Sequence, residues 1–104
     1  MNRNLEYWKS RIQPLLKPGF RLYSFEISLY LWNEARYVTR ILQIHSSGLP
    51  TEVIFTGYTK NSEFVYLRSD EETEDFLYEL LSRVNALSPL CVLSEHLNSG
   101  PGTK

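Results

Sequence analysis

The longest hydrophobic pattern in the chain runs from Phe20 to Trp32 and alternates with a period of two residues. Every second position from Tyr23 to Leu31 carries an aromatic or aliphatic side chain, whereas the positions between them mix apolar and polar residues. This alternation is typical of a β-strand with one buried face. The run Arg36–His45 follows a short polar connection and predicts the partner strand of a hairpin, around which the rest of the chain is organised.

The register of this hairpin follows from matching the apolar faces of its two strands. We expect Leu31 opposite Val38 and Ile27 opposite Leu42, because a shift by one residue would set apolar side chains against polar ones. Arg40 is the one charged residue on this apolar face, where its aliphatic stem can pack while the guanidinium reaches water. The first-strand side chains expected to be buried are Tyr23, Phe25, Ile27, Leu29 and Leu31.

The opposite face of the hairpin is mixed and gathers aromatic residues near the turn. If both helices pack on the apolar face, these aromatic side chains stay exposed, and each can bury roughly 150–250 Å² against a partner. Three of them approach the patch size of a few hundred Å² that usually marks an interaction site on a monomer. The residues of this predicted aromatic face are Leu22, Tyr30, Trp32, Tyr37 and Ile41.

Two further strands are predicted after a loop at 46–50. Glu52–Tyr58 is rich in β-branched and aromatic residues, with Gly57 as a weak point or a bulge. Glu63–Arg68 follows a turn at 60–62, and consecutive strands with short connections predict an antiparallel meander. Leu90–Leu93 is either a fifth strand at the edge or a packed extension.

Two helices flank the strands. Asn4–Gln13 places apolar residues at helical spacing; its first residue is a suitable N-cap, and Pro14 should end it. Asp70–Leu87 carries a continuous apolar stripe, and Ser69 followed three residues later by Glu72 is a capping-box signature. Both stripes must lie against the sheet.

These elements predict an α+β fold. We expect an antiparallel meander of four or five strands, with the N-terminal helix and the long helix after strand 4 packed on one face. Residues 1–94 should form a single domain, and residues 95–104 a flexible tail, because that tail is rich in glycine and small polar residues.

Composition and charge narrow the function classes. The 104-residue chain is 42% hydrophobic and 22% charged, as in ordinary globular domains, and its net charge of −1 gives no general attraction to nucleic acid or anionic membranes. The single cysteine, Cys91, excludes an internal disulfide, which fits a reducing compartment. Without an apolar signal core or a run long enough to span a bilayer, the chain is predicted to be cytoplasmic.

The long helix also carries an acidic face. Glu71, Asp75 and Glu79 recur at intervals of four residues, opposite the apolar stripe. Like charges at this spacing repel by about 0.2–0.5 kcal/mol per pair, and the helix N-terminus returns about 0.3–1 kcal/mol for a nearby carboxylate. The near balance leaves two interpretations open: a solvated helix face, or an acidic docking surface.

The sequence predicts no catalytic, metal or cofactor site. A zinc site needs three or four suitably spaced ligands, whereas His45, Cys91 and His96 are far apart in the sequence. No glycine-rich phosphate loop follows a predicted strand, and no pair of carboxylates is placed together by the pattern.

The function predicted from these features is a small non-enzymatic protein-binding or regulatory module, acting as a homodimer, an adaptor or an inhibitor. It would use the aromatic sheet face and the acidic helix face. The alternative is a module that binds single-stranded nucleic acid, with Tyr30, Trp32 and Tyr37 stacking on bases. In that alternative, Arg21, Arg36 and Arg40 would contact phosphates.

Overall fold

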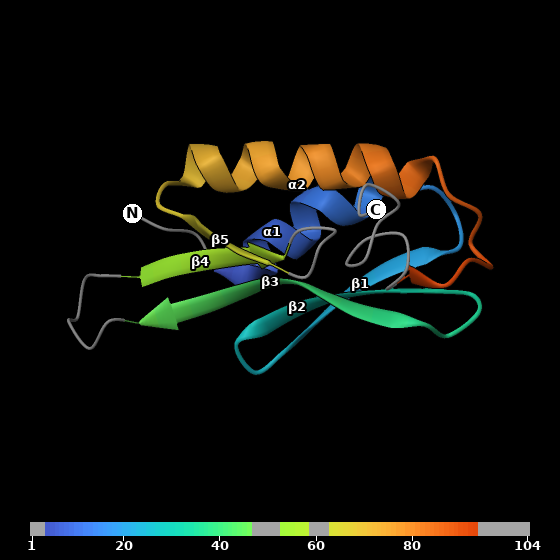
Figure 1. The fold of residues 1–104 in the computed structure, drawn as a ribbon, viewed down its shortest axis with the longest axis horizontal. Coiled ribbons are helices and arrows are strands. Elements are labelled where there is room, and N and C mark those ends of the chain that lie inside the picture. The colour runs from blue at the N-terminus through green and yellow to red at the C-terminus, as the bar shows by residue number, and fades with distance from the viewer. Residues whose placement is uncertain (1–3, 47–52, 59–62, 94–104) are drawn as a thin grey trace.

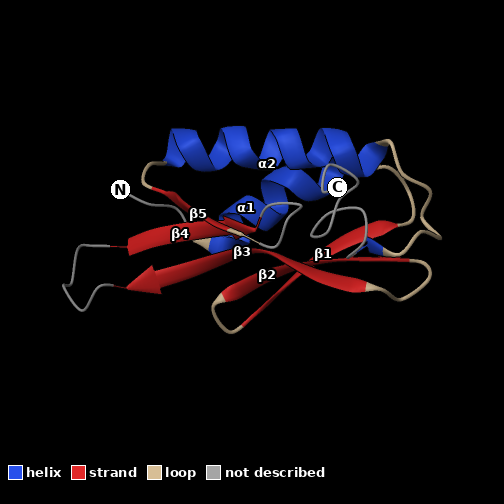
Figure 2. Ribbon diagram, viewed as in Figure 1, coloured by secondary structure: helices blue, strands red, loops and turns tan. Residues whose placement is uncertain are grey.

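The computed structural model describes residues 4–46, 53–58 and 63–93. Within these ranges, five strands form one antiparallel sheet in the order β1-β2-β3-β4-β5, and both α-helices lie on the same side of it (Figure 1). The predicted α+β fold is therefore confirmed. The elements in chain order (Figure 2) are α1 (Leu5–Ile12), the 3-10 turn η1 (Gln13–Leu15), β1 (Phe20–Phe25), β2 (Ser28–Asn33), β3 (Val38–Ser46), β4 (Val53–Tyr58), β5 (Phe64–Leu67) and α2 (Asp70–Asn85).

Both helices begin at the caps that the sequence indicates. At α1, the Asn4 side chain accepts a hydrogen bond from the Tyr7 N–H at 2.8 Å. At α2, the Ser69 hydroxyl accepts from the Glu72 N–H at 3.1 Å, and the Glu72 carboxylate reaches back to the Arg68 N–H at 2.9 Å. Each cap satisfies backbone donors that have no partner inside the helix, which fixes where the helix starts.

The run from Phe20 to Trp32 is two strands, not one. It reverses at a two-residue turn, Glu26-Ile27, so that Phe25 pairs with Ser28. Glu26 has a φ of 54°, the left-handed conformation that such a turn requires and that is more often occupied by Gly or Asn. The fifth strand of the sheet therefore comes from this division and not from Leu90–Leu93, which contains no strand.

This turn reverses which side chains are buried. Odd-numbered residues point away from the helices in β1 but toward them in β2, because cross-strand partners share a face. Leu29 and Leu31 are fully buried as expected, whereas Phe25 is 59% exposed. The prediction that Tyr23, Phe25 and Ile27 lie in the core is therefore wrong.

The register between β2 and β3 also differs from the prediction. Leu31 pairs with Thr39, not Val38, and a β-bulge next to Tyr30 leaves Ile41 as the extra residue of β3. The bulge restarts the alternation, so the adjacent residues Ile41 and Leu42 both point into the core. The predicted register is wrong because it assumes that inward and outward side chains alternate without interruption along β3.

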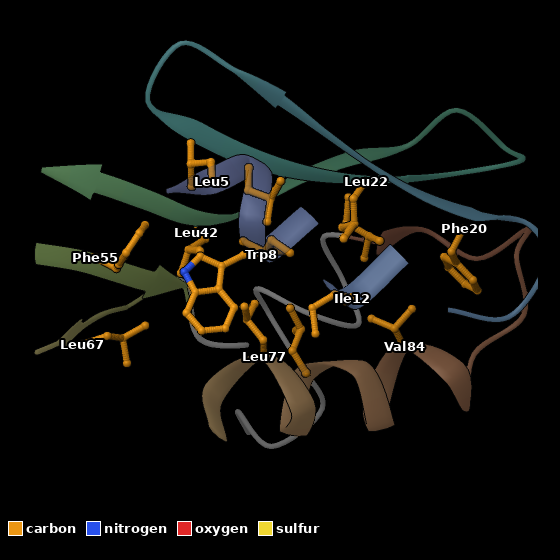
Figure 3. Close-up of a cluster of buried hydrophobic side chains, with 14 of the residues drawn as sticks. Leu5, Trp8, Ile12, Phe20, Leu22, Leu42, Phe55, Leu67, Leu77 and Val84 are labelled. Atoms are coloured by element: carbon orange, nitrogen blue, oxygen red, sulfur yellow. The ribbon is translucent and has the colours of Figure 1, made fainter. Parts of the chain in front are cut away.

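The core fills the space between the sheet and the two helices (Figure 3). Trp8 of α1 is 1% exposed and lies between Leu42 of the sheet and Leu77 of α2. Beside it, the Phe76 ring covers the backbone of Gly57 so closely that an added Cβ would lie 2.5 Å from the ring. Gly57 therefore marks a close helix–strand approach and not a bulge.

The outer edge of β1 is covered by a side chain. The Gln13 amide accepts a hydrogen bond from the Leu22 N–H at 2.7 Å and donates one to the Phe20 carbonyl at 3.4 Å. These are backbone groups that an adjacent strand would otherwise pair with. Gln13 thus takes the place of a sixth strand over part of this edge.

The segment after α2 closes one end of the core. Leu93 is fully buried there, and the Cys91 N–H donates to the Ser88 carbonyl in a turn. The structure describes no helix that is both long and apolar enough to cross a membrane. The predicted loop at 47–50, the turn at 60–62, the tail at 95–104 and His96 lie outside the described residues.

Candidate binding surface on the open face of the sheet

The face of the sheet that points away from the helices is the candidate site, and we call it the outer face. In the described part of the chain, both helices pack on the other side (Figure 1). Each strand contributes alternate side chains to the outer face, and aromatic residues are common among them. Phe25 on β1 and Phe64 and Tyr66 on β5 are the most exposed of these, at 59%, 58% and 59%.

One line of neighbouring residues crosses the outer face and takes one residue from each strand; we call it the central row. The Phe64 ring meets the Tyr58 ring edge-on at 4.9 Å, and the Arg40 guanidinium lies 4.6 Å from the centre of the Tyr58 ring. Arg40 pairs across β2 and β3 with Tyr30, which stacks on Tyr23 at 5.3 Å. Rings and one guanidinium thus follow one another across all five strands.

Two more arginines lie over outer-face rings. Arg21 is 5.4 Å from the Trp32 ring, and Arg68 is 5.9 Å from the Tyr66 ring. A cation over an exposed ring is stabilised by about 0.5–1 kcal/mol, and by about 2 kcal/mol when water is excluded. A partner that excluded water from this face would therefore strengthen contacts already in place.

The outer face is cationic in the described strands. The side chains that point outward from β1 to β5 include Arg21 and Arg40, and none of those described is a carboxylate. Arg68 adds a positive charge where β5 ends. This local charge is opposite in sign to the net charge of the whole chain, −1.

Arg40 is the least satisfied residue of the central row. It is half-buried, and its Nε is buried without a hydrogen-bond partner among the described residues. Tyr58, against which it packs, donates from its hydroxyl to the Gln43 side-chain oxygen at 2.9 Å. Burial raises the pKa of the Tyr58 phenol and the positive charge of Arg40 opposes that rise, so Tyr58 is a neutral ring at physiological pH.

The sequence-predicted aromatic residues are only partly brought together. Tyr30 and Trp32 lie on the outer face, half-buried, and Tyr37 is exposed in the connection before β3. Leu22 and Ile41 lie in the core beneath the helices, so their predicted place on this face is wrong. The physical reasons are the reversal at Glu26-Ile27 and the bulge at Ile41.

Several outer-face residues were missed by sequence reasoning. Tyr58, Phe64 and Tyr66 alternate along β4 and β5, and that alternation was the available signal. Without the pairing of β3 with β4, however, the sequence does not show that these rings join Tyr30 and Arg40. Tyr23 was missed because it was expected in the core.

The acidic residues of α2 occupy the opposite side of the molecule. Glu71, Asp75 and Glu79 are exposed on α2, and α2 lies across the sheet from the outer face (Figure 2). On the same helix, Glu74 pairs with Arg11 of α1 at 2.7 Å, and this contact raises the pKa of Arg11. The aromatic sheet face and the acidic face of α2 therefore cannot both contact one small partner at the same time.

His45 and Cys91, the other candidate ligands or nucleophiles in the described chain, make contacts that are typical of residues with a structural role. His45 lies 3.0 Å from the Thr56 hydroxyl, in a pair that joins β3 to β4. Cys91 is half-buried, and burial raises the pKa of its thiol, which disfavours the reactive thiolate. Within the described residues, no group of three histidine, cysteine or acidic side chains could hold a metal ion.

No protein-family model, curated protein or solved structure matches this chain. Relatives therefore assign no function to any of its residues. The geometry and charge of the outer face are the basis for the proposal that follows.

Proposed function

We propose that the protein is a small non-enzymatic regulatory module that binds a protein partner on the outer face of its sheet. The observation that carries this proposal is the central row of aromatic rings and one guanidinium, with no helix over it in the described chain. Aromatic residues and arginine are the side chains that contribute most to protein interfaces. Tyr58 in the middle of the row is buried, but Tyr23 and Phe64 at its two ends are exposed, and exposed apolar side chains gathered on one face often mark a binding site.

The charge of the outer face favours a heterologous partner, as in an adaptor or an inhibitor. In a two-fold dimer formed through this face, the arginines of both copies would enter one interface to which the described strand residues bring no carboxylate, and like charges in an interface cost free energy. The exposed carboxylates of Glu71, Asp75 and Glu79 offer a second docking surface on the far side. Two opposite surfaces suit an adaptor that joins two proteins.

Site-specific photocrosslinking in lysate of the source cells tests this proposal. A benzophenone amino acid is placed at Tyr66 on the outer face or, as the matched control, at Leu15, which is also exposed but lies in η1. We expect a specific crosslinked protein from position 66 and none from position 15. A crosslink to a second copy from position 66 would instead support the homodimer, and equal crosslinking from both positions would remove the outer face as the site.

A second candidate function is binding of single-stranded nucleic acid through the same face. The observation that favours it is the alternation of arginines with stacked rings, as in Arg21 over Trp32 and Arg40 over Tyr58. Stacking of a base on an aromatic side chain contributes about 1–3 kcal/mol. Titration of Trp32→Ala and the native protein with a labelled dT12 oligonucleotide at low and moderate salt tests it; an unchanged anisotropy at low salt would remove this candidate.

A further inference from the structure

We propose that Arg40 is the anion-binding centre of the outer face and that its ligand is a carboxylate, presented by a protein segment with apolar neighbours. This inference rests on the proposed protein-binding function and names the chemistry of the partner. The outer face would then have two parts: a central charge that fixes the position of the partner, and surrounding rings that bury its apolar side chains.

Arg40 lies near the centre of the outer face. It lies on β3, the middle strand, between Tyr30 on β2 and Tyr58 on β4. The bulge that buries both Ile41 and Leu42 leaves Arg40 outward on the other side of the sheet. Its guanidinium is therefore held near the centre of the outer face by the regular structure of three strands, not by a loop.

The guanidinium of Arg40 lacks polar partners among the described residues. The guanidinium packs on the Tyr58 ring, but its buried Nε has no hydrogen-bond partner in the described chain, and no carboxylate there pairs with it. A half-buried guanidinium that the described residues leave without a counter-charge gains from a carboxylate brought by a partner. The planar guanidinium is well matched to a carboxylate, which it binds through two parallel hydrogen bonds.

The distribution of the other charges favours a carboxylate over a run of phosphates. Arg21 lies on β1 and Arg68 follows β5, so the three arginines of the outer face are spread from one edge of the sheet to the other. Exposed apolar side chains lie among these arginines, at Phe64, Tyr66 and Val38. A single acidic side chain at Arg40, with apolar neighbours over these residues, matches that arrangement better than a continuous polyanion.

A random library of displayed dodecapeptides, selected against the immobilised full chain, tests the proposal. Peptides that also bind the double variant Phe64→Ser/Tyr66→Ser are discarded, so that those retained depend on the outer face. We expect the retained peptides to share one Asp or Glu next to apolar residues. Arg40→Gln should weaken their binding at least tenfold, and Arg40→Lys should weaken it less.

Two controls make the result specific. Arg68→Gln removes an arginine that also lies over an outer-face ring but at the rim, and it should change the affinity less than threefold. Replacing the acidic residue of the peptide by its amide should weaken binding to the native protein, and should have little further effect on Arg40→Gln. An unchanged thermal melting curve of Arg40→Gln shows that the variant is folded.

The outcomes separate this inference from the proposed function. If the retained peptides lack a shared acidic residue and bind Arg40→Gln with native affinity, the inference is overturned while the proposed function stands. If no peptide depends on Phe64 and Tyr66, both are overturned. If dT12 binds and Arg40→Gln abolishes that binding while no peptide is retained, the anion is a phosphate and the protein partner is excluded.

Discussion

The side-chain amide of Asn33 donates a hydrogen bond to the backbone carbonyl of Cys91 at 2.9 Å, although the two residues are 58 positions apart in the chain. The same side chain accepts from the Tyr37 N–H at 3.1 Å and is 2% exposed. One buried amide thus fixes the turn between β2 and β3 and anchors the segment after α2 to it. Losing such a buried contact is costly, because the backbone groups that it pairs would have neither a protein partner nor water to bond with.

We therefore expect Asn33→Ala to lower the free energy of unfolding by about 2 kcal/mol, since it leaves two backbone groups unpaired. Urea unfolding followed by tryptophan fluorescence measures this change. Glu34→Ala, in the exposed neighbouring position, should stay within about 0.5 kcal/mol of the native protein. Equal stabilities of Asn33→Ala and Glu34→Ala would contradict the anchoring role.

Gly19 should tolerate no side chain. Its φ is 102°, and an added Cβ would lie 2.6 Å from the Pro89 ring, so Gly19→Ala combines backbone strain with a clash. We expect a loss of about 1–3 kcal/mol, measured by urea unfolding. Pro89→Gly removes the Cβ and Cγ atoms that clash but not the strain, so Gly19→Ala should cost less in the Pro89→Gly background than in the native protein. A cost of zero in that background would show that backbone strain contributes nothing.

Gln13→Ala should expose the edge of β1. The Leu22 N–H loses its 2.7 Å acceptor, so we expect its amide hydrogen to exchange faster, while that of Leu31 in the neighbouring strand stays protected. The free energy of unfolding should fall by about 1 kcal/mol. Hydrogen exchange followed by NMR reads both amides, and unaltered exchange at Leu22 would refute the role assigned to Gln13.

The Cys91 thiol should react slowly while the protein is folded. Burial raises its pKa, so the reactive thiolate is scarcer at a given pH than in the unfolded chain. The rate of alkylation by iodoacetamide should therefore rise at higher pH in the folded protein than in urea. A folded-state profile that coincides with the one in urea would contradict this.

The same shift gives a pH dependence of stability. Because the folded pKa lies above the unfolded one, Cys91 stabilises the fold below the unfolded pKa, and this contribution is lost as the pH rises through the folded pKa. In Cys91→Ser, this part of the pH dependence should be absent. Urea unfolding across the alkaline range, on both proteins, measures the difference.

The helices and the fold class could be predicted from the sequence because their signals are local. Asn4 and Ser69 mark the helix starts directly. The Glu26-Ile27 turn was missed because it lacks the residues that usually announce a two-residue turn and because Ile27 continues the apolar alternation. The bulge at Ile41 was missed because a pair of adjacent apolar residues also fits a regular strand with one exposed residue.

The candidate site was predictable only where it depends on a single hairpin. That Tyr30 and Trp32 lie on the side of the sheet away from the helices followed from the packing of both helices on one face. The rest of the central row depends on how β3 pairs with β4 and β4 with β5, and those registers bring together residues from distant parts of the chain. Arg40 is a charged misfit on the face that the sequence predicts to be buried, and the bulge explains why it lies on the outer face instead.

The amide of Gln13 also limits how this sheet could grow. A strand from another molecule that added to β5 would leave β1 as the outermost strand of each copy, and there the side chain already occupies the hydrogen-bonding groups of Phe20 and Leu22. Further extension at β1 would have to displace that amide. The sheet is thus protected at one end against the open-ended strand stacking that leads to fibrils.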